Sequence, residues 1–157
     1  MMNFGFTAFL LLAVMLLLVA AAIIDLRTFT ISNRLNALVA LLALAFWWSV
    51  GLPFWPDAAI RIAVAGGVFA LLALAFYAGM MGGGDVKLAA ALALWFPPVS
   101  TLRFLVFMSI AGGLVTLVIL VIHRLRSNDG RPQIPYGVAI ALGALPILAQ
   151  RFLNQFA

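Results

Sequence analysis

The chain has 157 residues and a formal net charge of +5; 67% of its residues are hydrophobic and only 8% are charged. A soluble domain is usually about half apolar and about a quarter charged, so this composition excludes a water-soluble globular protein. Cysteine is absent, which excludes disulfide bonds, a thiol nucleophile and a cysteine-ligated zinc site. The nine basic residues form no dense run, so we expect them to orient the chain and contact membrane lipids, not nucleic acid.

Successive hydrophobic segments predict an all-α polytopic membrane helix bundle, in one domain over residues 1–157. Because a span needs ~20 residues, the chain has room for about six. The expected spans are Phe4–Ile24, Leu35–Trp55, Ala58–Met81, Val86–Phe96, Thr101–Ile122 and Tyr136–Leu153. The fourth would cover only about half of a ~30 Å hydrocarbon core, so it is either a short helix sheltered by its neighbours or a re-entrant one.

Charge predicts the orientation of these spans. No basic residue precedes the first segment, so we expect a retained span and not a secretory signal. Six basic residues fall on one side of the predicted membrane: Arg27, Arg34, Lys87, Arg124, Arg126 and Arg131. Three fall on the other: Arg61, Arg103 and Arg151. The positive-inside rule places the first group in the cytoplasm.

Small residues recur within the expected spans, at Gly66-Gly67, Gly112-Gly113 and Gly143. Membrane helices associate without a hydrophobic drive from lipid, so their interfaces favour small residues. We expect these glycines to mark close helix packing.

Two aspartates stand out in a chain without glutamate. Asp25 ends the first span, and Asp85 lies between the third and the fourth. Two spans separate them, so both lie on the same side of the membrane. Two neighbouring carboxyl groups share one proton, so one can activate water while the other donates a proton to a leaving amine. The competing interpretations are a juxtamembrane charge for Asp25 and a helix N-cap after a glycine turn for Asp85.

The other polar candidates have simpler interpretations. Asp57 is expected to cap the third helix, and Asp129 to lie in a turn. His123 has the position of an interfacial residue, without partners for a metal. Lys87 is expected to anchor the interface, with tuning of the Asp85 pKa or a substrate contact as the alternative. Tyr136 is an interfacial aromatic that could also reach the site.

The segment Gly82-Gly83-Gly84-Asp85 matches the Gly-x-Gly-Asp signature of membrane aspartic peptidases. Extended by Val86 and Lys87, and combined with Asp25 at the end of the first span, it resembles the type IV prepilin peptidase family. The regions 25–35 and 134–139 also look like that family, and the resemblance covers about residues 23–145. Ser32 stands where the family often has proline.

The resemblance implies an aspartic endopeptidase that removes the basic leader of a prepilin or pseudopilin, a single-span membrane protein. Cleavage would follow a glycine, at the cytoplasmic face of the bacterial inner membrane. Asp25 and Asp85 would be catalytic, supported by Gly82, Gly84 and Lys87, without a cofactor or a metal. The short form looks most like the peptidases of tight-adherence (Flp) pilus systems. Larger relatives carry a cysteine-containing domain that N-methylates the product, so we expect no methylation here.

Two other functions remain open at this point. A small ion-coupled transporter would use Asp25 and Asp85 to bind protons or cations beside a broken helix. A presenilin-like intramembrane protease shares the chemistry, but it usually carries its first aspartate deeper in a helix. Substrate cleavage separates the transporter from both enzymes.

Overall fold

In the computed structural model, residues 4–125 and 133–154 are described, and these residues form helices and no strand. The elements are α1 (Phe4–Thr28), α2 (Asn33–Ser49), a π-helical turn η1 (Phe54–Ala58), α3 (Ala59–Tyr77), α4 (Gly83–Ala93), α5 (Pro98–Leu125) and α6 (Tyr136–Leu153). The predicted all-α polytopic class is confirmed.

Four helical segments are long and apolar enough to cross a membrane. They are Gly5–Thr28, Phe54–Tyr77, Pro98–Leu125 and Tyr136–Leu153. The described residues form six α-helices at the six predicted segments, and the fourth is the short one, as expected. Helix α2 has 17 residues and falls just short of this length, and α4 has only 11. At 1.5 Å per residue, α4 is about 16 Å long, too short for a ~30 Å core.

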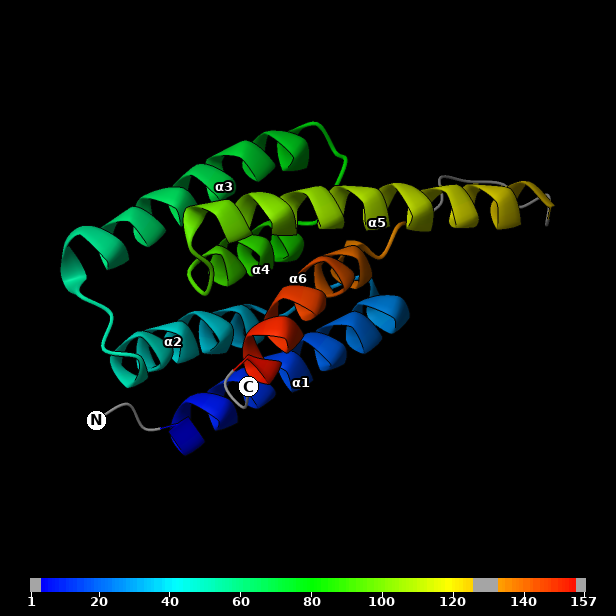
Figure 1. The fold of residues 1–157 in the computed structure, drawn as a ribbon. Coiled ribbons are helices and arrows are strands. Elements are labelled where there is room, and N and C mark those ends of the chain that lie inside the picture. Colours follow the sequence, from blue (N-terminus) through cyan, green and yellow to red (C-terminus); the bar gives the residue numbers. More distant parts are fainter. Residues whose placement is uncertain (1–3, 126–132, 155–157) are drawn as a thin grey trace.

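Helix α4 is nevertheless the centre of the bundle. It packs against α2, α3 and α6 (Figure 1), and Leu88 and Leu92 are fully buried. Just after the helix, the indole N–H of Trp95 donates to the carbonyl of Val39, at 3.0 Å. This is the sheltered arrangement of the short segment, because its neighbours cover the helix and its end.

The long helices pack unevenly. Helix α6 lies along both α1 and α5, whereas α3 contacts α5 at only a few points. Figure 1 shows α5 reaching past the other helices at its C-terminal end. The sparse α3–α5 interface leaves space between these two helices near the turn that leads into α4.

The glycines within the helices differ in how closely other helices approach them. A Cβ atom at Gly143 would lie 2.8 Å from the backbone nitrogen of Met108 in α5, so close packing is confirmed there. At Gly112 the nearest atom would be at an ordinary contact distance, 3.6 Å. The expectation is wrong for Gly66, Gly67 and Gly113, where a Cβ would meet no atom within 4 Å.

Candidate active site

Asp25 lies in the last turn of α1 and is buried, with 2% of its surface exposed. The backbone N–H of Gly137, at the start of α6, donates to its Oδ2 at 2.6 Å. A Cβ atom at Gly137 would come within 2.9 Å of both Cβ and Oδ2 of Asp25. Asp25 is therefore not an exposed juxtamembrane charge, and only glycine allows this close approach of α6.

Asp85 lies in the first turn of α4 and is 6% exposed. Its Oδ2 accepts a hydrogen bond of 3.1 Å from the backbone N–H of Gly82, which occupies the N-cap position. The interpretation of Asp85 as the N-cap residue is therefore wrong, although its side chain does serve the helix start. Its Oδ1 is buried without a hydrogen-bond partner in the described part of the chain. A neutral carboxyl group tolerates such burial better than an ionised one.

The two carboxyl groups lie close enough to interact. Burial first, and the negative charge of Asp25 second, raise the pKa of Asp85 to about 7. Asp85 lies outside the four candidate spans. Ile31 links the two sites, since it borders both Gly84 before Asp85 and Gly137 beside Asp25. The structure thus brings the ends of α1 and the starts of α4 and α6 to one place.

A polar residue that the sequence did not single out also belongs to this region. Asn36 on α2 is 5% exposed, and its Nδ2 donates to the carbonyl of Gly84 at 2.9 Å. Its Oδ1 is buried and lacks a hydrogen-bond partner within the described ranges. A Cβ at Gly84 would lie 2.6 Å from the carbonyl oxygen of Ile31, so the glycine allows the loop to cross α4 closely.

Lys87 and Ser32 have roles at the edge of the site. The Lys87 ammonium donates to Oδ1 of Asn33 at 2.9 Å and ties α4 to the start of α2. Lys87 lies at an exposed position, and among the described residues its ammonium group forms no salt bridge with the Asp85 carboxyl group. Ser32 caps α2, because its hydroxyl accepts from the backbone N–H of Leu35 at 3.3 Å.

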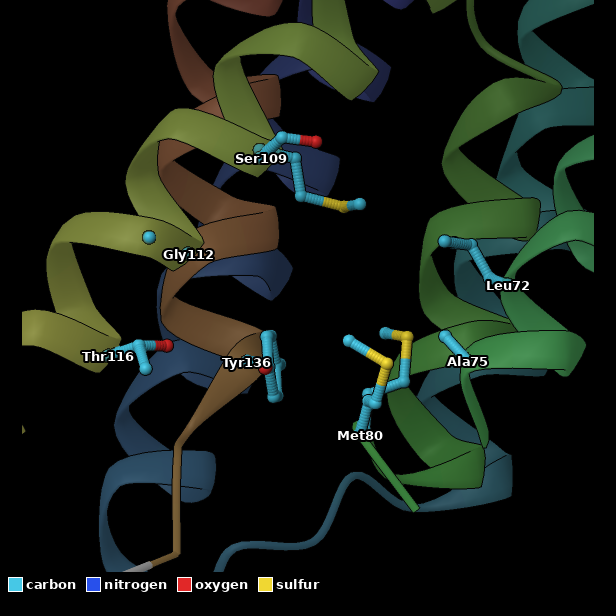
Figure 2. Close-up of a pocket in the computed structure, with 10 residues that line it drawn as sticks. Leu72, Ala75, Met80, Ser109, Gly112, Thr116 and Tyr136 are labelled. Atoms are coloured by element: carbon cyan, nitrogen blue, oxygen red, sulfur yellow. The ribbon is translucent and has the colours of Figure 1, made fainter. Parts of the chain in front are cut away.

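Asp85 opens onto a pocket of about 270 Å³. Its lining comprises Phe29, Gly79, Met80, Met81, Gly82, Asp85, Gln133, Ile134 and Tyr136. A second pocket, of about 380 Å³ and mostly apolar, shares Met80, Met81 and Tyr136 with the first. In Figure 2, Leu72 and Ala75 of α3 face Ser109, Gly112 and Thr116 of α5 across this second pocket. We call the two together the α3–α5 groove, and it leads from an apolar wall to the Asp85 carboxyl group.

Two other candidates, Asp57 and His123, do not line the groove. Asp57 is exposed in η1, and the start of α3 has no side-chain cap, so the expected cap is wrong. His123 lies near the C-terminal end of α5. Asp129 lies outside the described residues. Two contributors were missed: Gly137, within the C-terminal pattern that resembled the family, and Asn36, a polar residue in an otherwise apolar segment.

Residues 11–117 match the type IV leader peptidase family. The chain belongs to this family. The membership makes it a membrane peptidase with a prepilin-type substrate and disfavours the transporter. A search of curated proteins and of solved structures gave no significant match. The matched residues include Asp25 and Asp85 but end before Gly137, so the α6 contact to Asp25 comes from the structure alone.

Proposed function

We propose that this type IV leader peptidase is a Gly-x-Gly-Asp aspartic endopeptidase whose catalytic pair is Asp25 and Asp85. The observation that carries the proposal is the pair itself. Two buried carboxyl groups, from α1 and α4, interact so that the charge of Asp25 helps to raise the pKa of Asp85. Ionising both carboxyl groups would place two negative charges close together at a high cost in free energy, so the pair keeps one proton near neutral pH.

The roles of the two groups follow from where that proton lies. Asp85, with a pKa of about 7, holds it. Asp25 then accepts a proton from a water molecule as the water oxygen attacks the peptide carbonyl carbon. Asp85 donates a hydrogen bond to the developing oxyanion. When the C–N bond breaks, the amine leaves with a proton from the pair, and one proton remains shared.

The α3–α5 groove accounts for the substrate class. A prepilin-type substrate joins a polar leader to an apolar helix. The apolar wall from Leu72 to Thr116 suits the start of such a helix, and Met80 and Met81 are flexible enough to adapt to its side chains. The leader would pass Asp85 and leave through the more polar pocket, where Gly82 and Gln133 lie.

Further features fit the tight-adherence (Flp) subclass at the cytoplasmic face of the bacterial inner membrane. Arg27, Arg34 and Lys87 lie at the same end of the bundle as the pair, as the positive-inside rule requires of a cytoplasmic face. The chain has no cysteine and no long insertion between α1 and α2. We therefore propose cleavage without N-methylation.

Co-expression with an Flp-type prepilin, in a bacterial host lacking other prepilin peptidases, tests this proposal. We expect a shortened pilin whose new N-terminus follows the leader glycine and whose mass shows no added methyl group. A methylated product would contradict the last part alone. Absence of any product from several prepilins, with the enzyme inserted and folded, would contradict the proposed substrate. A presenilin-like protease would instead cut within the apolar helix.

A further inference from the structure

Two arginines converge on one carbonyl at the other end of α4, away from Asp85. Nη1 of Arg61 in α3 donates to the carbonyl oxygen of Trp95 at 3.3 Å, and Nη1 of Arg151 in α6 donates to the same oxygen at 3.1 Å. Arg61 is only 7% exposed. The guanidinium carbon of Arg151 also lies 4.4 Å from the centre of the Phe46 ring.

The positive charge of this cluster is only partly compensated. The C-terminal end of a helix supplies roughly half a negative charge, and one carbonyl is a partial charge only. Asp57 lies one turn before Arg61 and is exposed, and its negative charge attracts the Arg61 guanidinium group without forming a salt bridge with it. Within the described ranges no carboxylate forms a salt bridge with Arg151, whose charged neighbour is Arg61 itself. Two like charges close together in a poorly polar surrounding attract an anion.

A pocket lies beside Arg151 and has the lining such an anion needs. Its volume is about 320 Å³, and its lining comprises Phe96, Pro97, Ser100, Ile147, Gln150, Arg151 and Asn154. Arg151 offers a charged donor, while Ser100, Gln150 and Asn154 offer neutral ones. The start of α5, which borders the pocket, has no acidic residue in its first turn. The lining residues include no aspartate or glutamate.

We propose that this pocket binds a phosphate group, with Arg151 as its direct ligand and Arg61 as the second cation behind it. Arginine suits phosphate because its planar guanidinium group donates several hydrogen bonds in a fixed fork. In a membrane protein the same phosphate can belong to the headgroup of an anionic phospholipid or be free in solution. The site is separate from the catalytic pair and does not depend on the proposed peptidase function.

The test uses the purified full-length chain in a neutral detergent, with thermal unfolding followed by tryptophan fluorescence. A ligand that binds only the folded state raises Tm in a saturable way. The additions are phosphatidylglycerol, inorganic phosphate and, as the phosphate-free control, diacylglycerol. We expect phosphatidylglycerol to raise Tm and diacylglycerol to leave it unchanged. If inorganic phosphate also raises Tm, the phosphate group alone is sufficient for binding. If only phosphatidylglycerol raises Tm, the ligand is the phosphate of a lipid headgroup together with its acyl chains.

Arg151→Gln is the main variant, and Arg103→Gln is its matched control. Arg103 is exposed on α5, near the same end, and does not line the pocket. We expect the Arg151→Gln variant to need at least about tenfold more lipid for the same rise in Tm. This is the effect expected from the loss of one charge-assisted hydrogen bond. If Arg151→Gln does not fold, Gln150→Ala, which leaves the contact with Trp95 intact, must weaken the effect instead. Equal shifts with phosphatidylglycerol and diacylglycerol, or equal losses in the arginine variant and its control, would overturn the proposal.

Discussion

At the scale of single residues, the proposed mechanism depends on the proton that Asp85 holds. Its pKa is raised to about 7 by burial first and by the charge of Asp25 second. Below that pH the pair holds a proton that can reach the leaving amine. Above it both groups are ionised and the acid is lost. We therefore expect kcat/KM for prepilin cleavage to fall by about tenfold per pH unit above an apparent pKa near 7.

The profile belongs to the pair and not to one residue, since the two groups titrate together. Asp57 is an exposed aspartate outside the pair. An Asp57→Asn variant should therefore show the same fall of kcat/KM at alkaline pH as the wild type. Cleavage that kept increasing from pH 7 to pH 9 would contradict the role of Asp85 as the proton donor.

Gly137 is the second residue on which the site depends. A Cβ there would lie 2.9 Å from Asp25 and from the side chain of Ile31, so α6 or Asp25 must move. We expect Gly137→Ala to cost about 1–3 kcal/mol in unfolding free energy, as overpacking does. We also expect it to slow cleavage by about 100-fold, because catalytic groups tolerate little displacement. Thermal unfolding and a cleavage assay check the two effects.

Gly67→Ala is the matched control for that change. A Cβ at Gly67 meets no atom within 4 Å, and the residue lies inside α3. Alanine is favoured over glycine in a helix by about 1 kcal/mol, so this variant should be neutral or slightly more stable and fully active. Equal losses in both variants would mean that any added methyl group disturbs the bundle, and would remove the special role of Gly137.

At the scale of secondary-structure elements, the sequence predicted some helices well and others poorly. Helix α6 has the predicted bounds, Tyr136–Leu153, because Pro135 and polar residues limit an apolar run. Helix α4 begins at Gly83 and not at Val86. Glycines disfavour a helix when judged locally. Here tertiary contacts outweigh that preference, since Gly84 packs on Ile31 and Asn36 bonds its carbonyl.

The candidate site was predictable only in part, for a similar reason. Counting spans placed Asp25 and Asp85 on one side, which needs no knowledge of packing. Gly137 is 112 residues from Asp25 along the chain, and its backbone N–H carries no side-chain signal. The groove depends on α3 and α5 standing apart, which no local pattern encodes.

The groove between these two helices gives a prediction for the element scale. Gly113 borders the apolar pocket, and a Cβ there meets no atom within 4 Å, so a larger side chain enters the groove without a clash at its base. We expect Gly113→Leu to raise KM for a membrane-inserted prepilin by about tenfold. A change of this size corresponds to the loss of about two buried methylene groups from the contact between substrate and groove. Cleavage of a short peptide that lacks the apolar helix should be unchanged.

Gly67→Leu adds the same side chain to α3 at an open position outside the groove. Its kinetics should match those of the wild type. If Gly113→Leu also left KM unchanged, the substrate helix would have to dock elsewhere.

At the scale of the whole molecule, the orientation of the bundle decides where cleavage takes place. The chain has no cysteine, so single cysteines can be introduced and labelled without background. Thr30, exposed beside the pair, and Asp57, exposed in η1, lie at opposite ends of α2. We expect a membrane-impermeant thiol reagent to label Asp57→Cys in cells with a permeabilised outer membrane, and Thr30→Cys only after the inner membrane is opened. The reverse pattern would contradict a cytoplasmic active site.

Cleavage at the leader depends, in the proposed mechanism, on Asp25 and Asp85 acting as one catalytic pair. The most direct measurement compares leader cleavage by wild type, Asp25→Asn, Asp85→Asn and the matched Asp57→Asn variant, each purified and reconstituted with the same prepilin. We expect either change within the pair to lower the cleavage rate by at least about 100-fold, and Asp57→Asn to cleave like the wild type. Cleavage at the wild-type rate by a folded Asp25→Asn or Asp85→Asn protein would contradict a catalytic pair.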